Sequence, residues 1–441
     1  MSDNNLNTKK KGKKLDRRQF IKTSLATAAT AMFTTQITTR KVFGANSRLG
    51  IGFIGAGGRS GSHMKAAHWL KTQGNEDIEL VAVCDVYRPR MQGRIENFAP
   101  DAKGYMDHRE LLADKNVDIV CIATPDHIHG YQAIDSINAG KDVYCEKPVT
   151  HWRQFDLTKK LAKVVEKSDR VFQLGTQGMY DSAWHQMKRY VQEGMIGQPI
   201  LAECGYYRVG DWGERGMPID DPEAKPGPDL NWEAFLGDSP KRPFDVSRFF
   251  RWRMYEDYAG GPVTDLYPHS LTPVIFILGT GMPETVVATG GKLRYQEREV
   301  PDTFNMYIEY PEKVTVAVMG TQGNDYPGTG ARGAGSKIPV IRGWEGSLTI
   351  EENEIVFIPA PPDDVSVKKE KEAQRFTIDH GEDFIEYWRS FLTKCRKREK
   401  DTLSTMALGY QVQTALHMGM LSYREGKQAH FVVDQEKIIF A

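Results

Sequence analysis

The chain has 441 residues, of which 40% are hydrophobic, and its 58 lysines and arginines are balanced by 58 aspartates and glutamates. This length predicts two domains, and the absence of a basic excess argues against a nucleic-acid-binding protein. The five cysteines are scattered and form no C-x-x-C pair, which argues against a disulfide framework. No spacing of histidine, cysteine or acidic residues indicates a metal site, and we expect no metal.

Residues 1–45 have the pattern of an export signal. A lysine-rich stretch, Lys9 to Lys14, precedes the run "DRRQFIK", and a short Ala/Thr-rich stretch continues to Phe33. That stretch is too short and too polar to span a membrane. The run resembles the twin-arginine signal of bacteria, which is handled by a dedicated export machinery and implies a periplasmic location. The alternative is a basic tail with a chance pair of arginines.

Residues 46–177 alternate between short apolar runs and helical stretches. The apolar runs are "RLGIGFIG", "IELVAVCD", "VDIVCIATP", "DVYCEKP" and "VFQLGT". Continuous apolar strands separated by helices indicate a parallel sheet that is covered on both faces. The sequence therefore predicts an α/β fold for this part of the chain.

A glycine-rich turn, "GAGGRSG", follows the first predicted strand. Gly55 and Gly57 match the first two positions of G-x-G-x-x-G, and Ser60 takes the third. Glycines let the backbone turn tightly and approach a pyrophosphate at the helix N-terminus. Because the turn lies between a strand and a helix, it favours dinucleotide binding over an ordinary glycine turn.

Asp85 ends the second predicted strand. A carboxylate at this position accepts hydrogen bonds from the adenosine ribose and repels a 2′-phosphate. This favours NAD over NADP, although Arg88, three residues later, weakens the discrimination. The alternative is a surface aspartate at a strand end.

Two further strands end in polar motifs, "ATPDHIHG" and "YCEKPVTH". Ligands of open α/β sheets bind beyond the carboxyl ends of the strands, so we expect Lys147 to lie beside the cofactor. Pro148 keeps Lys147 out of helical geometry. The alternative is that Lys147 pairs with Glu146 in solvent.

Asp265 and His269 are the candidate acid–base pair of the second half. Oxidation of a secondary alcohol needs a base and a group that stabilises the alkoxide, and histidine is a suitable base near neutral pH. A spacing of four residues places both side chains on one face of a helix, where Asp265 would orient the imidazole. Lys147 would hold the substrate oxygen. The alternative is that Asp265 caps a helix and His269 is a packed residue of its first turn.

These motifs, with "GGPVTDLYPHSL", resemble the glucose–fructose oxidoreductase / inositol dehydrogenase (Gfo/Idh/MocA) family. The resemblance implies a Rossmann domain over 46–177, and an α+β domain with a large open, mostly antiparallel sheet over 178–375. C-terminal helices and a closing strand would occupy 376–441. It also implies that Lys147, Asp265 and His269 are catalytic. The implied cofactor-binding residues are Gly55, Gly57, Gly58, Arg59, Ser60, Asp85, Thr124, Pro125, His129, Glu146 and Lys147.

Two departures from the family pattern leave the substrate open. Tyr267 and Pro268 stand between Asp265 and His269, where many members have glycine, and Gly178 and Met179 replace arginines that many members carry. A long Pro-, Gly- and acid-rich segment, residues 211–229, is a candidate lid or partner arm.

We expect an exported oxidoreductase that transfers a hydride to or from a secondary alcohol of a sugar, glycoside or cyclitol. The periplasm offers no substantial pool of free nicotinamide cofactor, so the enzyme would carry tightly bound NAD(H). The family resemblance implies a homodimer or homotetramer. Two alternatives remain: an NAD-dependent redox-neutral glycosidase or lyase of the same fold, and a non-enzymatic, cofactor-bound sensor.

Overall fold

The computed structural model describes residues 48–210, 217–333, 335–361 and 372–441. The predicted export signal lies outside these residues, as do residues 211–216 of the candidate lid. No helix within the described ranges is both long enough and apolar enough to cross a membrane. All five cysteines are buried and free.

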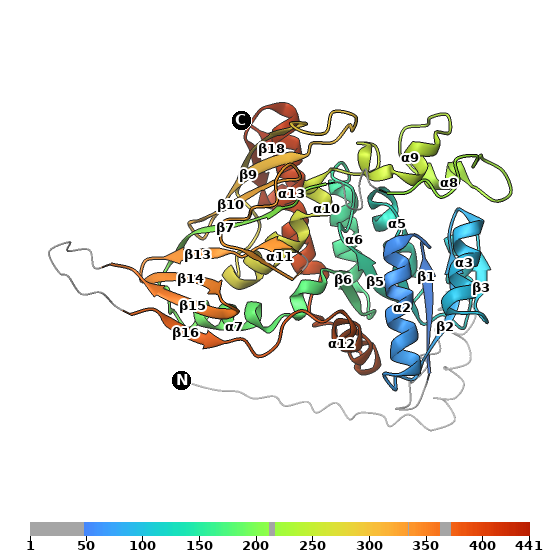
Figure 1. Cartoon of the computed structure of the whole chain (residues 1–441), viewed down its shortest axis with the longest axis horizontal. Helices are drawn as coiled ribbons and strands as arrows, with labels where there is room; N and C mark the ends of the chain where they lie inside the picture. The colour runs from blue at the N-terminus through green and yellow to red at the C-terminus, as the bar shows by residue number, and fades with distance from the viewer. Residues whose placement is uncertain (1–47, 211–216, 334, 362–371) are drawn as a thin grey trace, which may run out of the picture. The chain divides into compact units, whose positions relative to one another are not determined.

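The N-terminal half forms a six-stranded parallel sheet in the order β3-β2-β1-β4-β5-β6 (Figure 1). This is the strand order of a Rossmann fold, and it confirms the predicted fold class. The order in which strands are added to the sheet reverses between the parallel neighbours β1 and β4, so a crevice opens beyond the carboxyl ends of these strands. The strands are β1 Leu49–Ile54, β2 Ile78–Cys84, β3 Lys103–Tyr105, β4 Ile119–Ile122, β5 Asp142–Glu146 and β6 Phe172–Gly175.

Every residue of β1, β4 and β5 is buried, as expected for central strands covered on both faces. The helices of this half are α2 Gly58–Thr72, α3 Arg88–Phe98, α4 His108–Ala113, α5 Asp126–Asn138 and α6 Phe155–Lys167. Two short elements, β3 and α4, were not predicted. Helix α5 begins at Asp126, directly after Pro125 at its N-cap, and the run "DHIH" is buried in its first turn.

The second half is built on a mostly antiparallel sheet in the order β16-β15-β14-β13-β7-β10-β9-β8-β17-β18, which confirms the predicted architecture. Among the strands that the structure describes, its one parallel pair is β7 with β10; β12 pairs with β7, and β11 pairs with β12. The strands are β7 Pro199–Tyr207, β8 Thr285–Gly291, β9 Thr303–Tyr310, β10 Val314–Thr321, β11 Ala331–Arg332, β12 Ser336–Lys337, β13 Val340–Gly343, β14 Gly346–Glu351, β15 Glu354–Pro359, β16 Gln374–Thr377, β17 Ala429–Val432 and β18 Lys437–Phe440.

Helices from the second half return to the first sheet (Figure 1). Helix α12 packs against α2, and α13 packs against β8, α11 and α6. Within this contact the Trp388 ring stacks on Tyr144, with centroids 4.7 Å apart. The helical elements are η1 Gln177–Tyr180, α7 Ser182–Gln192, α8 Trp232–Leu236, α9 Val246–Phe250, η2 Trp252–Met254, α10 Pro262–Asp265, α11 Tyr267–Leu278, α12 Phe384–Lys397, α13 Met406–Glu425 and η3 Val433–Gln435.

One segment of the second half of the chain reaches back to the start of α3. It comprises residues 217–250, and we call it the strap. Figure 1 shows its helices α8 and α9 above α3 and α5. Tyr87 packs into an aromatic cluster with strap residues that include Trp232 and Phe249. Arg88 donates its backbone N–H to the carbonyl of Asp229, and Asn231 donates to Val86. The described part of the predicted lid is therefore held against the Rossmann domain.

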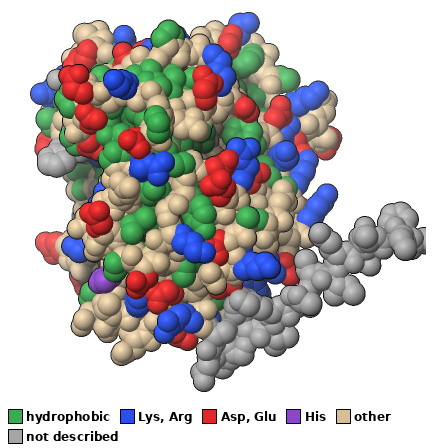
Figure 2. Space-filling view, turned by 90° about the vertical axis from the view of Figure 1, so that its right-hand side faces the viewer, with side chains coloured by type: hydrophobic (Ala, Val, Ile, Leu, Met, Phe, Trp, Pro, Cys, Tyr) green, Lys and Arg blue, Asp and Glu red, His purple; other side chains and the backbone are tan. Residues whose placement is uncertain are grey.

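The surface at the Rossmann end carries both signs of charge. Figure 2 shows lysines and arginines interspersed with acidic side chains over this face. This mixture is consistent with the balanced composition of the chain.

Candidate active site

A cleft opens beyond the carboxyl ends of β1, β4 and β5, between the Rossmann domain, the strap and helices α10 and α11. Its volume is about 1570 Å³. A site for one small molecule usually occupies about 300–1,000 Å³. The cleft therefore has room for a dinucleotide together with a second ligand.

The glycine turn forms one wall of the cleft. Gly55 has φ +95°, and a Cβ there would lie 2.6 Å from the carbonyl oxygen of Ala123. Gly57 and Gly58 instead face open space at the N-terminus of α2, with no atom within 4 Å of a Cβ position. This open cradle fits a pyrophosphate group. Ser60 is fully buried and is not among the cleft-lining residues, so its place is between helix and sheet.

Asp85 lies in the cleft wall at the end of β2. Its carboxylate accepts hydrogen bonds from the backbone N–H groups of Ala56, at 2.6 Å, and Tyr87, at 2.8 Å. Burial raises the pKa of Asp85. Arg88 turns away to the strap, where it binds the Asp229 carboxylate at 2.8 Å. Arg88 is thus already paired and does not line the cleft. It therefore does not weaken the discrimination against the 2′-phosphate of NADP, contrary to the expectation from the sequence.

Thr124, Pro125 and His129, which the family resemblance implies to be cofactor-binding, line the cleft beyond β4. The Nδ1 atom of His129 lies 2.7 Å from the carbonyl oxygen of Pro148, and Nε2 lies 2.7 Å from that of Thr124. Burial lowers the pKa of His129. The ring lies between the loops that follow β4 and β5, and in its neutral form it donates to one of these two carbonyls.

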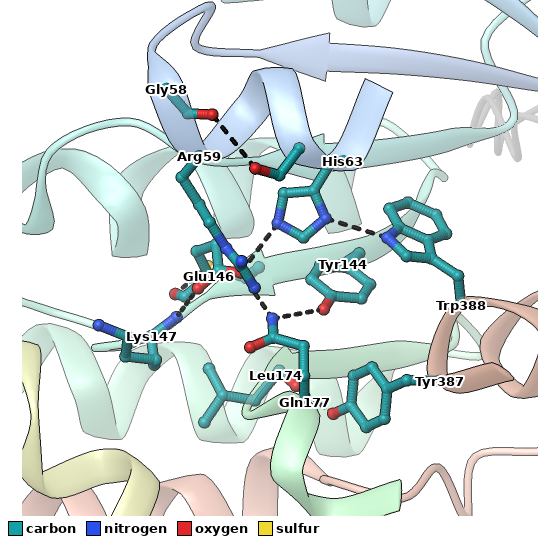
Figure 3. A network of polar contacts seen from close by, with 12 residues as sticks. Gly58, Arg59, His63, Tyr144, Glu146, Lys147, Leu174, Gln177, Tyr387 and Trp388 are labelled. Carbon is teal, nitrogen blue, oxygen red and sulfur yellow. Dashed lines mark hydrogen bonds and ion pairs between the residues drawn. The ribbon is translucent and has the colours of Figure 1, made fainter. Parts of the chain in front are cut away.

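Glu146 is the centre of a buried hydrogen-bond network (Figure 3). One of its oxygens, Oε1, accepts from Arg59 Nε at 2.8 Å, His63 Nε2 at 2.8 Å and Gln177 Nε2 at 2.7 Å. Burial opposes ionisation, but Arg59 and the His63 hydrogen bond hold the pKa of Glu146 well below its usual range. The alternative for Lys147, a pair with Glu146 in solvent, is therefore wrong, because Glu146 points inward.

The tautomer of His63 follows from its second neighbour. The indole Nε1–H of Trp388 donates to His63 Nδ1 at 3.0 Å, so Nδ1 is an acceptor. The ring proton is therefore on Nε2, which donates a hydrogen bond to Glu146. Burial lowers the pKa of His63, which keeps this ring neutral. Through Trp388 and His63, helix α12 is thereby connected by hydrogen bonds to Glu146 at the end of β5.

Lys147 and Asp265 contact each other at the end of the cleft that lies away from Asp85 and next to helices α10 and α11. Lys147 Nζ donates to the backbone carbonyl of Asp265 at 2.6 Å and to its carboxylate at 3.0 Å. Arg253 Nε lies 3.3 Å from the same carboxylate, and an Arg208 amino group lies 3.7 Å from it. Burial opposes ionisation, but these three cations hold the pKa of Asp265 well below its usual value. Asp265 is therefore a carboxylate at neutral pH.

Asp265 does not orient His269, contrary to the expectation from their spacing. Helix α10 ends at Asp265, and α11 begins at Tyr267, so the two residues do not share one helix. The N-cap of α11 is Leu266, whose side chain makes no cap hydrogen bond. The alternative expectation, that Asp265 caps this helix, is therefore also wrong. The carboxylate orients Lys147 instead.

His269 lies in the first turn of α11 and lines the cleft beside Lys147. Burial and the charge of Lys147 lower the pKa of His269 to about 3, so its imidazole is neutral at physiological pH. The ring also borders a smaller cavity of about 20 Å³, lined by Arg332, Lys337 and Glu382 among others. This volume is sufficient for about one water molecule.

Sequence reasoning missed several residues of the cleft. Asp126, Arg208 and Arg253 line the end that holds Lys147. Burial raises the pKa of Asp126 to about 7, although Arg253 and Lys147 oppose the shift. Asp126 could have been found from the sequence, because it lies in the motif "ATPDHIHG". Arg208 and Arg253 lie in separate parts of the chain, and neither belongs to a recognisable motif. No group of three potential metal ligands occurs within the described ranges.

Comparison with known proteins gives two matches to one oxidoreductase family. Residues 49–176 match the NAD-binding Rossmann domain of the GFO/IDH/MocA family, and residues 235–340 match a C-terminal domain of the same family. The cofactor of this domain type is NAD, as predicted. Residues 14–34 match the twin-arginine translocation signal, which confirms the predicted export signal.

Several relatives are inositol 2-dehydrogenases. The protein from Salmonella typhimurium is 33% identical over 132 residues, which cover 30% of this chain and 39% of that protein. The protein from Burkholderia multivorans is 28% identical over 240 residues, which cover 53% of this chain and 64% of that protein. The matches therefore span less than two thirds of these curated relatives.

Solved structures share the fold across nearly the whole described chain. The WlbA dehydrogenase from Chromobactrium violaceum, in complex with NADH and UDP-GlcNAcA, has a TM-score of 0.64 at 19% identity and covers 88% of this chain and 98% of its own. A levoglucosan dehydrogenase with NADH and levoglucosan has a TM-score of 0.65 at 18% identity and covers 87% and 99%. Together with the two family-domain matches, this fold establishes that the chain is a member of the Gfo/Idh/MocA oxidoreductase family.

Proposed function

We propose that the protein is a periplasmic oxidoreductase that carries tightly bound NAD(H) and oxidises or reduces a secondary alcohol of a sugar, glycoside or cyclitol. One observation carries the proposal. Lys147, Asp265 and His269 converge on the same cleft as the open glycine turn and Asp85. A dinucleotide site and a set of acid–base residues therefore share one enclosed space.

The residues that would hold NAD are the glycine turn, Asp85 and the loop after β4. Gly57 and Gly58 leave the space for the pyrophosphate, and Asp85 offers carboxylate oxygens to the adenosine ribose. Bound NAD supplies the hydride acceptor or donor. Glu146 would act indirectly, because its network with Arg59 and His63 fixes the end of β5 next to Lys147.

Lys147 and His269 divide the proton chemistry. The ammonium of Lys147, positioned by Asp265, stabilises negative charge on the substrate oxygen. His269 is neutral and so can accept the hydroxyl proton, but a pKa of about 3 makes it a weak acceptor by itself. The alkoxide must therefore be stabilised by Lys147 as the proton leaves, which makes the two groups interdependent.

The strap supports tight cofactor binding. Arg90 binds Asp220 of the strap at 2.5 Å, and Arg88 binds Asp229 at 2.8 Å. Both ion pairs join the strap to the start of α3, next to Asp85, so the strap covers the adenosine end of the cleft. A covered cofactor leaves slowly, which suits an enzyme exported after folding.

A homodimer or homotetramer is the proposed assembly. Apolar side chains are exposed on several strands of the second sheet, among them Val287 on β8, Tyr307 on β9 and Ile358 on β15. Burial of such exposed apolar side chains against a second copy would remove them from water.

The test is to purify the exported protein and supply a panel of free cyclitols and nitrophenyl glycosides. We expect NAD to remain bound through dialysis, and we expect a keto product with matching NADH formation and no release of nitrophenol. Release of nitrophenol without net change of the cofactor would instead identify the redox-neutral glycosidase. An empty protein with weak affinity for NAD would contradict the proposal.

A further inference from the structure

Two guanidinium groups lie at the end of the cleft that holds Lys147. Arg208 follows strand β7, and Arg253 lies in η2, directly after the strap. Both side chains line the cleft, and only 22% and 21% of their surfaces are exposed. Neither belongs to the cofactor or catalytic residues considered above.

Arg253 has donors that the protein leaves poorly used. Its Nε reaches the Asp265 carboxylate at 3.3 Å, and Nη1 reaches the sulfur of Met217 at 3.6 Å. Thioether sulfur is a weak acceptor. Nη2 makes no hydrogen bond to any residue that the structure describes.

The orientation of Arg253 is fixed nonetheless. Its guanidinium lies over the ring of Trp252, 4.2 Å from the centroid. Met217, which Arg253 Nη1 contacts, is itself held because its carbonyl accepts from Arg251 Nε at 2.9 Å. A fixed, planar cation with unused donors is suited to a planar anion.

Among the residues that the structure describes, the acidic groups of this end do not fully offset the cations. Lys147, Arg208 and Arg253 surround the Asp265 carboxylate, and Glu382 also lines the cleft. Asp126 is the remaining acidic group beside Arg253, and its pKa of about 7 leaves it partly protonated at neutral pH. An added anion would therefore be attracted to this end.

We propose that Arg253, with Arg208 beside it, binds a carboxylate of the substrate. The substrate would then be a sugar acid such as a uronic acid residue, an inference that rests on the proposed function. An arginine fork accepts a carboxylate through two parallel hydrogen bonds. Lys147 and His269, in the same cleft, would then act on a hydroxyl of that sugar.

The experiment compares matched ligands on the NAD-loaded protein. Methyl glucuronide and methyl glucoside differ in one carboxylate, and glucose 6-phosphate tests a phosphate in its place. Binding is measured by calorimetry, and reduction of the bound cofactor is followed separately at 340 nm. We expect the uronide to bind at least about 10-fold more tightly than the glucoside and than the phosphate ester, the scale of a charge-assisted hydrogen-bond pair.

Three variants identify the residue responsible. Arg253→Met should remove the preference for the uronide and leave binding of the glucoside within about 2-fold. Arg253→Lys should restore part of it, because lysine returns the charge without the fork. Arg375→Met, which removes an arginine on β16, serves as the control.

The two hypotheses fail in different ways. Equal or tighter binding of the glucoside, or an unchanged preference in Arg253→Met, would overturn the sugar-acid inference. Tighter binding of the phosphate ester would also overturn it, since the site would then be selective for phosphate. Selective binding of the uronide without any reduction of NAD, across the whole panel, would contradict the proposed function and leave the anion site standing.

Discussion

The ammonium of Lys147 binds Asp265 twice, donating to its backbone carbonyl at 2.6 Å and to its carboxylate at 3.0 Å. The contact joins the end of β5 in the Rossmann domain to the end of α10 in the second half, 118 residues later in the chain. A displacement of Asp265 would therefore also displace the Lys147 ammonium, which lies in the same cleft as the glycine turn and His269.

Asp265→Asn should lower turnover by about 10²-fold, the scale of a positioned acid–base group. The amide keeps the shape of the side chain but removes the charge that balances Lys147, Arg253 and Arg208. Steady-state kinetics and NAD content measure the effect, and NAD content should stay constant. The control is Asp156→Asn, at a carboxylate that is 92% exposed on α6. Full activity in Asp265→Asn would show that the carboxylate has only a structural role.

Glu146→Gln should destabilise the folded protein by about 3 kcal/mol, because it removes the charge that pairs with Arg59 and weakens the acceptor of the neutral His63 Nε2–H. The pKa of Glu146 is lowered in the folded state, so its contribution to stability is complete above its unfolded pKa of about 4.3 and is lost as the pH falls below that value. Denaturant titrations between pH 3 and 7 should therefore show that the free energy of unfolding falls less steeply at acid pH in the variant than in the parent.

Glu96→Gln is the matched control, because this side chain is exposed on α3. Its stability should equal that of the parent at every pH. Equal pH slopes for Glu146→Gln and the parent would contradict the ionised state of Glu146.

The strap should control release of the cofactor. Asp220→Asn combined with Asp229→Asn removes both of its ion pairs to α3, and we expect NAD to dissociate about 10-fold faster. Glu233→Gln removes an ion pair that lies wholly within the strap, with Lys241, and should leave the rate unchanged. Displacement of bound NAD by a fluorescent analogue gives the rate. The same rate in all three proteins would exclude the strap as the retaining element.

The twin-arginine signal predicts a specific export defect. Changing Arg17 and Arg18 to lysine should keep the protein in the cytoplasm, folded and loaded with NAD, while Lys13→Arg with Lys14→Arg should be exported normally. Cell fractionation followed by nucleotide analysis distinguishes these results. Periplasmic protein in normal amount from the Arg17/Arg18 variant would mean that another route exports it.

The parts of the fold that were predictable are those specified locally. The strands of the first sheet appear in the sequence as apolar runs because both faces are buried, and the glycine turn is visible because Gly55 needs φ +95° where a Cβ has no room. The short elements β3 and α4 carry too few residues for a pattern, and each depends on its packing against β2.

The site was predictable only where one motif contains it. His63 and Trp388 are 325 residues apart, so nothing in the sequence near either residue indicates their hydrogen bond. The spacing of Asp265 and His269 suggested one helix, but the chain ends α10 and restarts at Tyr267–Pro268. That break turns Asp265 toward Lys147, a contact that depends on how the two halves of the chain pack together.

The absorbance of the enzyme-bound cofactor at 340 nm, after rapid mixing with the sugar and cyclitol panel, tests the central claim most directly. We predict that the parent protein forms close to one NADH per chain with its substrate. Lys147→Ala and His269→Ala should keep NAD but form NADH about 10²-fold more slowly. The double variant should lose far less than the product of the two effects, because the groups act together. Formation of NADH at the parent rate in both single variants would contradict the account.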